Sequence, residues 1–529
     1  MEISRKNFAD QIENITKDLK RSCLVGFDAE FTAILSGECF KHRLFDDNEE
    51  RYNQIKTEVS KMIMTQVGLT MFQYEREHDS YVAVGYTFHL CPQIFGNVDQ
   101  SFIFQASTLK FLCKHNFDFN KFIYEGLPYL SKFEESKVRQ QLHDKSLFDN
   151  LNTTLEMSDE KQIQSYCSEV SNWLVNSEEG TMYLDVQDPV LRYILHNELR
   201  IRCPNVLTTD SLGNSNKILI YRDKYVEGAT SAPMAVLEEN LVTHLQGFSQ
   251  IMNLLAEYKK PIVGHNIFLD MVLIHNQFIG PLPNKYTDFK KNINNLFPNI
   301  YDTKYISHEM RNKLTFDESW KSNALQDLYE FFAEGKCKKL RNGVNFIRLS
   351  TPFNVKQSYH EAGWDSYCSG YCFLRLAHWA ACENMGKYRP VGPTEKLAAM
   401  APYCNRVNII RGAVPYMNLV GQDPPRHRPQ LLHVKSVKER VINVGKVASV
   451  LSSCGVVDVK AYGKRTALVA ANSHFTADKI LKQFKNNGVY KISTYRAYKH
   501  STAGRMTIWG GAILTGSLLL FLLHKNVNK

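Results

Sequence analysis

The chain has 12 Cys residues but no C-x-x-C pair and no spacing typical of a zinc site. This absence argues against a zinc module. Cys368 and Cys372 lie four positions apart, which fits one face of a core helix better than a pair of metal ligands. We therefore expect reduced thiols and a protein that faces the cytosol. The N-terminal residues are charged and lack an apolar stretch, so no secretory signal is expected.

Acidic residues are scarce in the last quarter of the chain. Residues 401–529 hold 20 Lys and Arg against 4 Asp and Glu, a net charge of +16. The first 400 residues hold 44 basic and 50 acidic residues, a net charge of −6. This asymmetry indicates a C-terminal part that binds a polyanion. Basic residues that face anionic lipid headgroups are an equally good interpretation at this point.

Four acidic residues are the most informative feature that is present. Asp28 and Glu30 interrupt an apolar run, Asp270 follows another, and Asp365 closes a His-Glu-Ala-Gly-Trp-Asp segment. Alternation along a buried strand would place Asp28 and Glu30 on one face. Two buried carboxylates repel each other and require a cation. Oxygen ligands of this kind suit Mg²⁺ or Mn²⁺, and four acids could complete a two-metal site.

Each of these residues also has a structural interpretation. Asp270 could interact with backbone N–H groups at the start of a helix. His360 and Asp365 could be polar residues of a loop. However, His360 lies five residues before Asp365, which is the spacing of the DEDDh exonuclease pattern. The combination favours a nuclease site over a set of independent structural residues.

Several segments then resemble the poly(A)-specific ribonuclease family of 3′→5′ exoribonucleases, over about residues 1–395. The matching segments are Met1–Ile3 with Asn7 and Phe8, Gln66–Leu69, Phe117–Lys121, Val263–Asn266 with Leu269 and Asp270, Asp302–Lys304, and His360–Gly363 with Asp365. A hydrophobic C-terminal tail makes the chain more similar to the membrane-anchored branch of this family.

The resemblance implies a 3′→5′ exoribonuclease that acts on single-stranded RNA with a free 3′ end and releases nucleoside 5′-monophosphates. Asp28, Glu30, Asp270 and Asp365 would hold two Mg²⁺ ions, or Mn²⁺, and His360 would act as general base. In the membrane-anchored branch the substrates are precursors of PIWI-interacting RNAs, and the partners are PIWI proteins and a Tudor-domain scaffold. Poly(A) tails are the alternative substrate, and a non-catalytic, membrane-tethered RNA-binding protein is the second alternative.

The fold expected for the catalytic part is an α/β ribonuclease H-like sandwich formed by residues 1–164 and 236–399. Strands are predicted at 24–34, 62–74, 80–90 and 260–263, and helices at 241–258, from 266 onward, and within 359–382. Residues 165–235 are interpreted as an inserted module. In it, Arg192 and His196 resemble an Arg-x-x-x-His signature for single-strand binding, although an ordinary helix with an i,i+4 pair fits equally well. Phe31 could pack against the terminal nucleotide or belong to the core.

Residues 400–429 are rich in Pro and predict a partly extended linker. Residues 430–499 then follow a βαββαβ order typical of an RRM-like domain. The strand expected to carry base-stacking aromatics contains Ala467 and Val469 instead, and Ala461 replaces the cap-binding Trp of the family. Charged residues could still bind phosphate, and the candidates are Lys460, Lys464, Arg465 and Arg496.

Residues 506–523 form an uncharged run of 18 residues. A helix of this length spans about 27 Å, enough for a thin bilayer. This run predicts a transmembrane tail anchor, with a buried amphipathic helix as the alternative. The short basic tail suits the outer mitochondrial membrane, and the endoplasmic reticulum is the other candidate.

Overall fold

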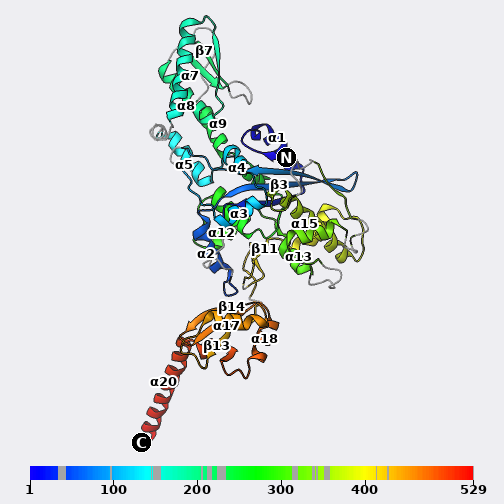
Figure 1. Cartoon of the computed structure of the whole chain (residues 1–529), viewed down its shortest axis with the longest axis vertical. Coiled ribbons are helices and arrows are strands. Elements are labelled where there is room, and N and C mark those ends of the chain that lie inside the picture. Colours follow the sequence, from blue (N-terminus) through cyan, green and yellow to red (C-terminus); the bar gives the residue numbers. More distant parts are fainter. Residues whose placement is uncertain are drawn as a thin grey trace. The chain divides into compact units, whose positions relative to one another are not determined.

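The computed structural model describes residues 1–33, 43–95, 98–144, 146, 157–203, 206–210, 217–222, 234–311, 320–335, 340, 344–350, 358–412, 414–425 and 428–527. The chain forms two compact units. In Figure 1 the colours follow the sequence from the N-terminus in blue to the C-terminus in red. The first unit comprises Met1–Leu35, Asn53–Asn408 and Asn418–Gly421, and the second unit comprises Ser36–Tyr52, Ile409–Met417 and Gln422–Lys529.

A mixed sheet is the centre of the first unit. Its strands in the described residues are β1 Glu2–Ile3, β2 Leu24–Phe31, β3 Met64–Glu75, β4 Ser80–His89, β8 Ile262–Gly264, β9 Ile300–Asp302, β10 Ile347–Leu349, β11 Arg406–Asn408 and β12 Tyr416–Asn418. The spatial order is β1-β4-β3-β2-β8-β9-β11-β12, and β10 pairs with β4. The strands β2, β3 and β4 are antiparallel, whereas β2, β8, β9 and β11 are parallel. The sheet is therefore mixed, and with its helices it forms the α/β fold that the sequence predicts.

Helices surround this sheet (Figure 1). Their bounds in the described residues are α1 Phe8–Arg21, α2 Asn48–Val59, α3 Ala106–Lys114, α4 Phe119–Glu125, α5 Lys132–His143, α9 Met234–Gln246, α10 Ser249–Tyr258, α11 Phe268–Ile274, η2 His275–Ile279, α12 Tyr286–Leu296, α13 Thr303–Arg311, α14 Leu325–Ala333, α15 Ala362–Met385, α16 Pro393–Met400 and η5 Ala401–Tyr403.

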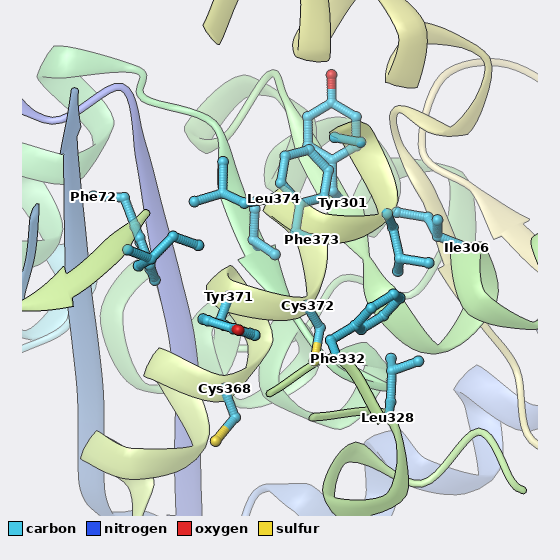
Figure 2. Packing of buried hydrophobic residues seen from close by; sticks show 14 of the residues in the cluster. Phe72, Tyr301, Ile306, Leu328, Phe332, Cys368, Tyr371, Cys372, Phe373 and Leu374 are labelled. Atoms are coloured by element: carbon cyan, nitrogen blue, oxygen red, sulfur yellow. The ribbon is translucent and has the colours of Figure 1, made fainter. Parts of the chain in front are cut away.

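The long helix α15 packs directly on the backbone of β2 and β3. A Cβ atom added at Gly26 would lie 2.1 Å from the carbonyl oxygen of Ser366, and one at Gly68 would lie 1.8 Å from that of Ala362. Any larger residue at these two positions would push the helix away from the sheet. The helix also contributes Cys368 and Cys372 to a hydrophobic cluster, shown in Figure 2, so both thiols are buried as predicted.

The helix predicted at 241–258 is two helices, because Gly247 breaks it between α9 and α10. Gly247 has φ +42°, and a Cβ atom there would lie 2.2 Å from the carbonyl oxygen of Pro128. The next residue, Phe248, donates its N–H to that same oxygen at 2.9 Å. The apolar periodicity continues through the break, which is why the sequence pattern predicted one element.

The insertion contains α7 Met157–Asn176, β5 Thr181–Asp185, α8 Pro189–Arg202, β6 Val206–Asp210 and β7 Lys217–Arg222. Its three strands have the antiparallel order β5-β7-β6. Residues of this part share one hydrophobic cluster with Val138 of α5 and Leu237 of α9. Arg192 is half-buried and His196 is fully buried. Direct contact between the His196 ring and RNA is therefore not compatible with this structure.

Residues 400–429 are not simply a linker. β11 extends the parallel side of the large sheet by pairing with β9, and β12 follows β11 at the sheet edge. Both strands are only three residues long, so neither produces a periodic pattern that sequence analysis would detect.

The second unit contains β13 Leu432–Ser436, α17 Val444–Leu451, η6 Ser452–Cys454, β14 Val457–Gly463, β15 Thr466–Ala471, α18 His474–Gln483, β16 Tyr490–Thr494, α19 Ala497–His500 and α20 Thr502–Val527. The sheet has the antiparallel order β14-β15-β13-β16. The element order is the predicted βαββαβ, while identity as an RNA-recognition module stays a prediction.

The interpretation of Ala467 and Val469 was wrong, because both side chains belong to the core of the second unit. Their small size therefore carries no information about the opposite, outward face of the sheet. On that face, His433 lies across from Leu468, and Leu468 lies across from Lys460. The sequence pattern places Ala467 and Val469 on the outward face, whereas Leu468 lies there. A shift of one residue along a strand exchanges its two faces.

Among the residues that the structure describes, no helix combines the length and apolar character needed to cross a bilayer. The predicted transmembrane span at 506–523 falls within α20, and this finding does not support it. Several side chains of that span lie outside the described residues.

Candidate active site

Asp28 and Glu30 lie on β2, between β3 and β8. The strand register places Asp28 opposite Gly68 and Glu30 opposite Gln66. Because side chains alternate along a strand, both carboxylates project from the same face, as predicted. The pairing shifts after Glu30, and the half-buried Phe31 ends the strand. A contact between Phe31 and a nucleotide stays a prediction.

Asp270 lies in the first turn of α11 and is 7% exposed. The helix begins after the turn that follows β8, and its N-cap residue Ile267 makes no side-chain capping bond. A different residue, Asp302 at the end of β9, accepts the N–H of Asn266 at 2.8 Å and that of Ile267 at 3.3 Å. Asp302 therefore fixes the entry into the helix that carries Asp270.

Asp365 lies in the first turn of α15, and three contacts with β3 hold this end of the helix. The Gln66 side chain accepts the N–H of Ala362 at 2.9 Å. The hydroxyls of Thr70 and Ser366 form a buried hydrogen bond of 2.8 Å. Together with the contact at Gly68, these bonds bring Asp365 close to the acids of the neighbouring strand β2. The sequence could not show this convergence, because β2 and α15 are separated by more than 300 residues.

His360 precedes α15 in a left-handed conformation with φ +68° and is exposed. Its backbone N–H donates to Asp365 Oδ2 at 3.0 Å. Its ring lies 4.3 Å from that of His115 and 4.8 Å from that of Phe111, measured between centroids. Potential ligand atoms of Glu30, His360 and Asp365 all lie within 4.8 Å of one another. The structure therefore brings Glu30, His360 and Asp365 together.

The acids share a strongly unfavourable electrostatic environment. Burial, followed by the charges of Asp365 and Asp270, raises the pKa of Asp28 and of Glu30 well above their ordinary values. Burial also raises the pKa of Asp270 and of Asp365 to about 7. Ionisation of all four carboxylates in this arrangement is therefore costly without a compensating cation.

The donor set fits a divalent metal ion. All four candidate side chains offer carboxylate oxygens, the ligands that Mg²⁺ and Mn²⁺ prefer. In the described part of the chain, Asp365 Oδ1 is buried and has no hydrogen-bond partner. A buried carboxylate oxygen without a partner is energetically costly and is satisfied by a bound cation.

His360 is suited to accept a proton. Partial desolvation, and then the charges of His115 and Lys114, lower the pKa of its imidazole. The ring is therefore neutral at physiological pH, as a general base must be. His115 and Phe111 were missed by the sequence analysis, because their separation from His360 in the chain gives no local signal.

Glu361 and Asp302 are acids near the site with structural roles. Glu361 accepts the N–H of Trp364 at 3.2 Å and the hydroxyl of Thr87 at 3.0 Å, so it caps α15. Asp302 is fully buried, and the hydrogen bonds that it accepts from the described residues come from backbone N–H groups. The sequence signal for Asp302 was its place at the end of an apolar strand, followed by Thr and Lys.

The predicted RNA contacts outside the acidic site lie elsewhere in the chain. Lys460, Lys464, Arg465 and Arg496 are all exposed in the second unit. Arg465 donates to the carbonyl of Val437 at 2.9 Å, and Arg496 donates to the Tyr498 hydroxyl at 2.8 Å. Their role in RNA binding stays a prediction.

Comparison with known proteins agrees with this site. The sequence model of the CAF1 family ribonucleases matches residues 3–373. The chain belongs to the CAF1 ribonuclease family.

Three relatives in this family cover nearly the whole chain. The Bombyx mori pre-piRNA 3′-exonuclease trimmer is 64% identical over 99% of both chains. The mouse poly(A)-specific ribonuclease PNLDC1 is 30% identical over 95% of both chains. The Xenopus laevis poly(A)-specific ribonuclease PARN is 27% identical over 94% of this chain and 81% of its own. The resemblance to poly(A)-specific ribonucleases is thereby confirmed.

The raised pKa values predict how pH affects the metal-free protein. Asp365 and Asp270 have folded-state pKa values of about 7. The folded state therefore keeps protons that the unfolded chain loses near its ordinary pKa of about 4. The contribution of these groups to stability is lost as pH rises from about 4 to about 7.

We expect Asp365→Asn to raise the melting temperature in EDTA, and this gain over the wild type to grow from pH 5.5 to 7.5. Mg²⁺ or Mn²⁺ should stabilise the wild type increasingly with pH and the variant much less. Differential scanning fluorimetry measures both, with Asp288→Asn on the exposed start of α12 as control. Equal pH and metal responses in wild type and Asp365→Asn would contradict the assignment.

Proposed function

We propose that this protein is a divalent-metal-dependent 3′→5′ exoribonuclease that trims the 3′ ends of single-stranded RNA, with PIWI-interacting RNA precursors as substrates. The observation that carries the proposal is the convergence of Asp28, Glu30, Asp270 and Asp365 with His360 in a CAF1-family chain. The DEDDh assignment rests on this set and on the five-residue spacing of His360 and Asp365.

In this mechanism the four carboxylates would hold two divalent ions, which supply positive charge to the scissile phosphate when bound. His360 accepts a proton from the attacking water, because its ring is neutral and partly open to solvent. The water attacks the phosphorus of the terminal phosphodiester, the bond to the 3′ oxygen of the preceding nucleotide breaks, and that oxygen takes up a proton from solvent. The product is a nucleoside 5′-monophosphate, and the shortened RNA keeps a free 3′ hydroxyl.

The choice of substrate follows the relatives. The most similar of the three relatives above is named as a pre-piRNA 3′-exonuclease trimmer, whereas the poly(A)-specific ribonucleases are 30% and 27% identical. This difference favours trimming of PIWI-interacting RNA precursors, with poly(A) tails as the alternative substrate. PIWI proteins and a Tudor-domain scaffold are the partners that such a substrate implies. A non-catalytic RNA-binding role is disfavoured by the complete set of acids and His360.

A membrane location is a further part of the proposal, and it is supported by the sequence alone. Residues 506–523 carry no charge, and basic residues lie on both sides of this run. We propose attachment to the outer mitochondrial membrane, with the catalytic unit in the cytosol and with the endoplasmic reticulum as the alternative.

Removal of one metal ligand should abolish trimming. In Asp28→Asn or Glu30→Gln, we expect the rate on a labelled single-stranded RNA to fall by several orders of magnitude, because electrostatic stabilisation of the transition state depends on the bound metal. RNA affinity, measured by filter binding, should largely survive. Asp288→Asn should behave as the wild type. Retention of more than about a tenth of the activity, a loss below roughly 1.4 kcal/mol, would reject these residues as ligands.

The two substrate classes are separated by comparing rates on a poly(A) RNA and on a mixed-sequence RNA of equal length. Contacts to the backbone and to the terminal phosphate carry little sequence information, so we expect similar rates and a strong dependence on salt. A preference for poly(A) beyond about a hundredfold, roughly 2.7 kcal/mol, would favour the deadenylase function instead.

Deletion of 506–529 tests the membrane proposal. The truncated protein should leave the membrane fraction after carbonate extraction and still degrade free RNA in vitro, because the acidic site lies in the other unit. A truncated protein that still pelleted with mitochondria would show that the tail is not the anchor. Extraction of the full-length protein by carbonate would also show that the tail is not a membrane anchor.

A further inference from the structure

The buried carboxylate of Asp302 joins three segments of the first unit. Its Oδ1 accepts the N–H of Asn266 at 2.8 Å and that of Lys304 at 2.9 Å. Its Oδ2 accepts the N–H of Ile267 at 3.3 Å and that of Asn408 at 2.9 Å. Asp302 is completely buried, so these four bonds replace the water that the carboxylate has lost.

Asn408 is connected to the same turn a second time. Its side-chain Nδ2 donates to Oδ1 of Asn266 at 2.8 Å. Asn266 has φ +63°, a left-handed conformation that Asn adopts more readily than most residues but that still needs support from its surroundings. Asn408 therefore supports this turn both through Asp302 and directly.

The turn at Asn266 determines where Asp270 points. Asp270 follows it by four residues, in the first turn of a short helix, α11, of seven residues. The N-cap residue Ile267 makes no capping bond with its own side chain. The direction of the helix therefore depends on the bonds that Asp302 and Asn408 make to the preceding turn.

We propose that Asn408 is a positioning residue for the catalytic site, which acts through Asn266 to place the carboxylate of Asp270. The proposal rests on the proposed function, because it takes Asp270 as a metal ligand. Asn408 lies outside residues 3–373, the part matched by the family. It is the last residue of β11, and the chain passes into the second unit at Ile409.

The size of the expected effect follows from the bond that is lost. Loss of this hydrogen bond leaves the turn less constrained, and a displaced metal ligand weakens catalysis further. In Asn408→Ala we therefore expect kcat to fall about tenfold while KM for RNA stays within about twofold. The Mn²⁺ concentration that gives half of the maximal thermal stabilisation, measured without RNA, should rise about five- to tenfold.

A double-mutant cycle tests the route through Asn266. Asn266→Gly removes the acceptor and keeps the left-handed conformation accessible. This single variant should match Asn408→Ala, and the double variant should be no worse than either, because both remove the same bond. Arg406→Ala is the control on the same strand, since the Arg406 guanidinium donates to the Tyr305 hydroxyl at 3.4 Å, and it should keep the wild-type Mn²⁺ midpoint.

Two comparisons separate the failure of this inference from failure of the proposed function. If Asp270→Asn keeps its activity, the catalytic assignment itself is wrong. If Asp270→Asn is inactive but Asn408→Ala has the wild-type Mn²⁺ midpoint, or if the two effects add in the double variant, the positioning role is overturned. If Asn408→Ala does not fold, Asn408→Ser is tested in its place. Unfolding of both variants would show that Asn408 is required for the fold, and would also overturn the proposal.

Discussion

The mutual repulsion of four closely placed carboxylates, two of them half-buried and two buried, is the constraint on which the catalytic unit is built. Burial is the largest cause of the raised pKa of each acid. The charges of Asp365 and Asp270 raise the pKa values of Asp28 and Glu30 further. A fold that keeps these groups together must supply stability from elsewhere, because they oppose folding whenever they are ionised and no cation is bound. The arrangement is costly without a metal and favourable with one, which is a property of a site selected for function.

The stability is supplied by direct contact of backbones and by a large hydrophobic core. Gly26 and Gly68 let α15 lie against β2 and β3 without intervening side chains. On the same helix, Cys368 and Cys372 join the core cluster (Figure 2), so the turn that carries Asp365 continues directly into buried helix. Catalytic groups placed on rigid elements in this way keep their geometry better than groups placed on loops.

Different contacts hold Asp270 in its place in the site. Asp270 lies on a short helix whose entry is fixed by Asp302, a further buried acid that accepts hydrogen bonds from backbone N–H groups. Asp302 and Asp365 therefore have different roles, because they differ in the number of N–H groups that donate to their carboxylates. Asp302 has four such donors and remains structural, whereas Asp365 Oδ1 has no partner in the described residues and is available to a cation.

Features that depend on neighbours in the chain could be predicted from the amino-acid sequence. It identified the strand with Asp28 and Glu30, the helix start at Asp270, and the spacing of His360 and Asp365, because alternation and short motifs are local. Only the tertiary structure decided that Asn408 reaches Asn266, or that Gly247 breaks a helix against Pro128. It also decided that Ala467 and Val469 belong to the core, because alternation gives a strand two faces without saying which one is buried. These properties depend on contacts between distant segments, and no local pattern encodes them.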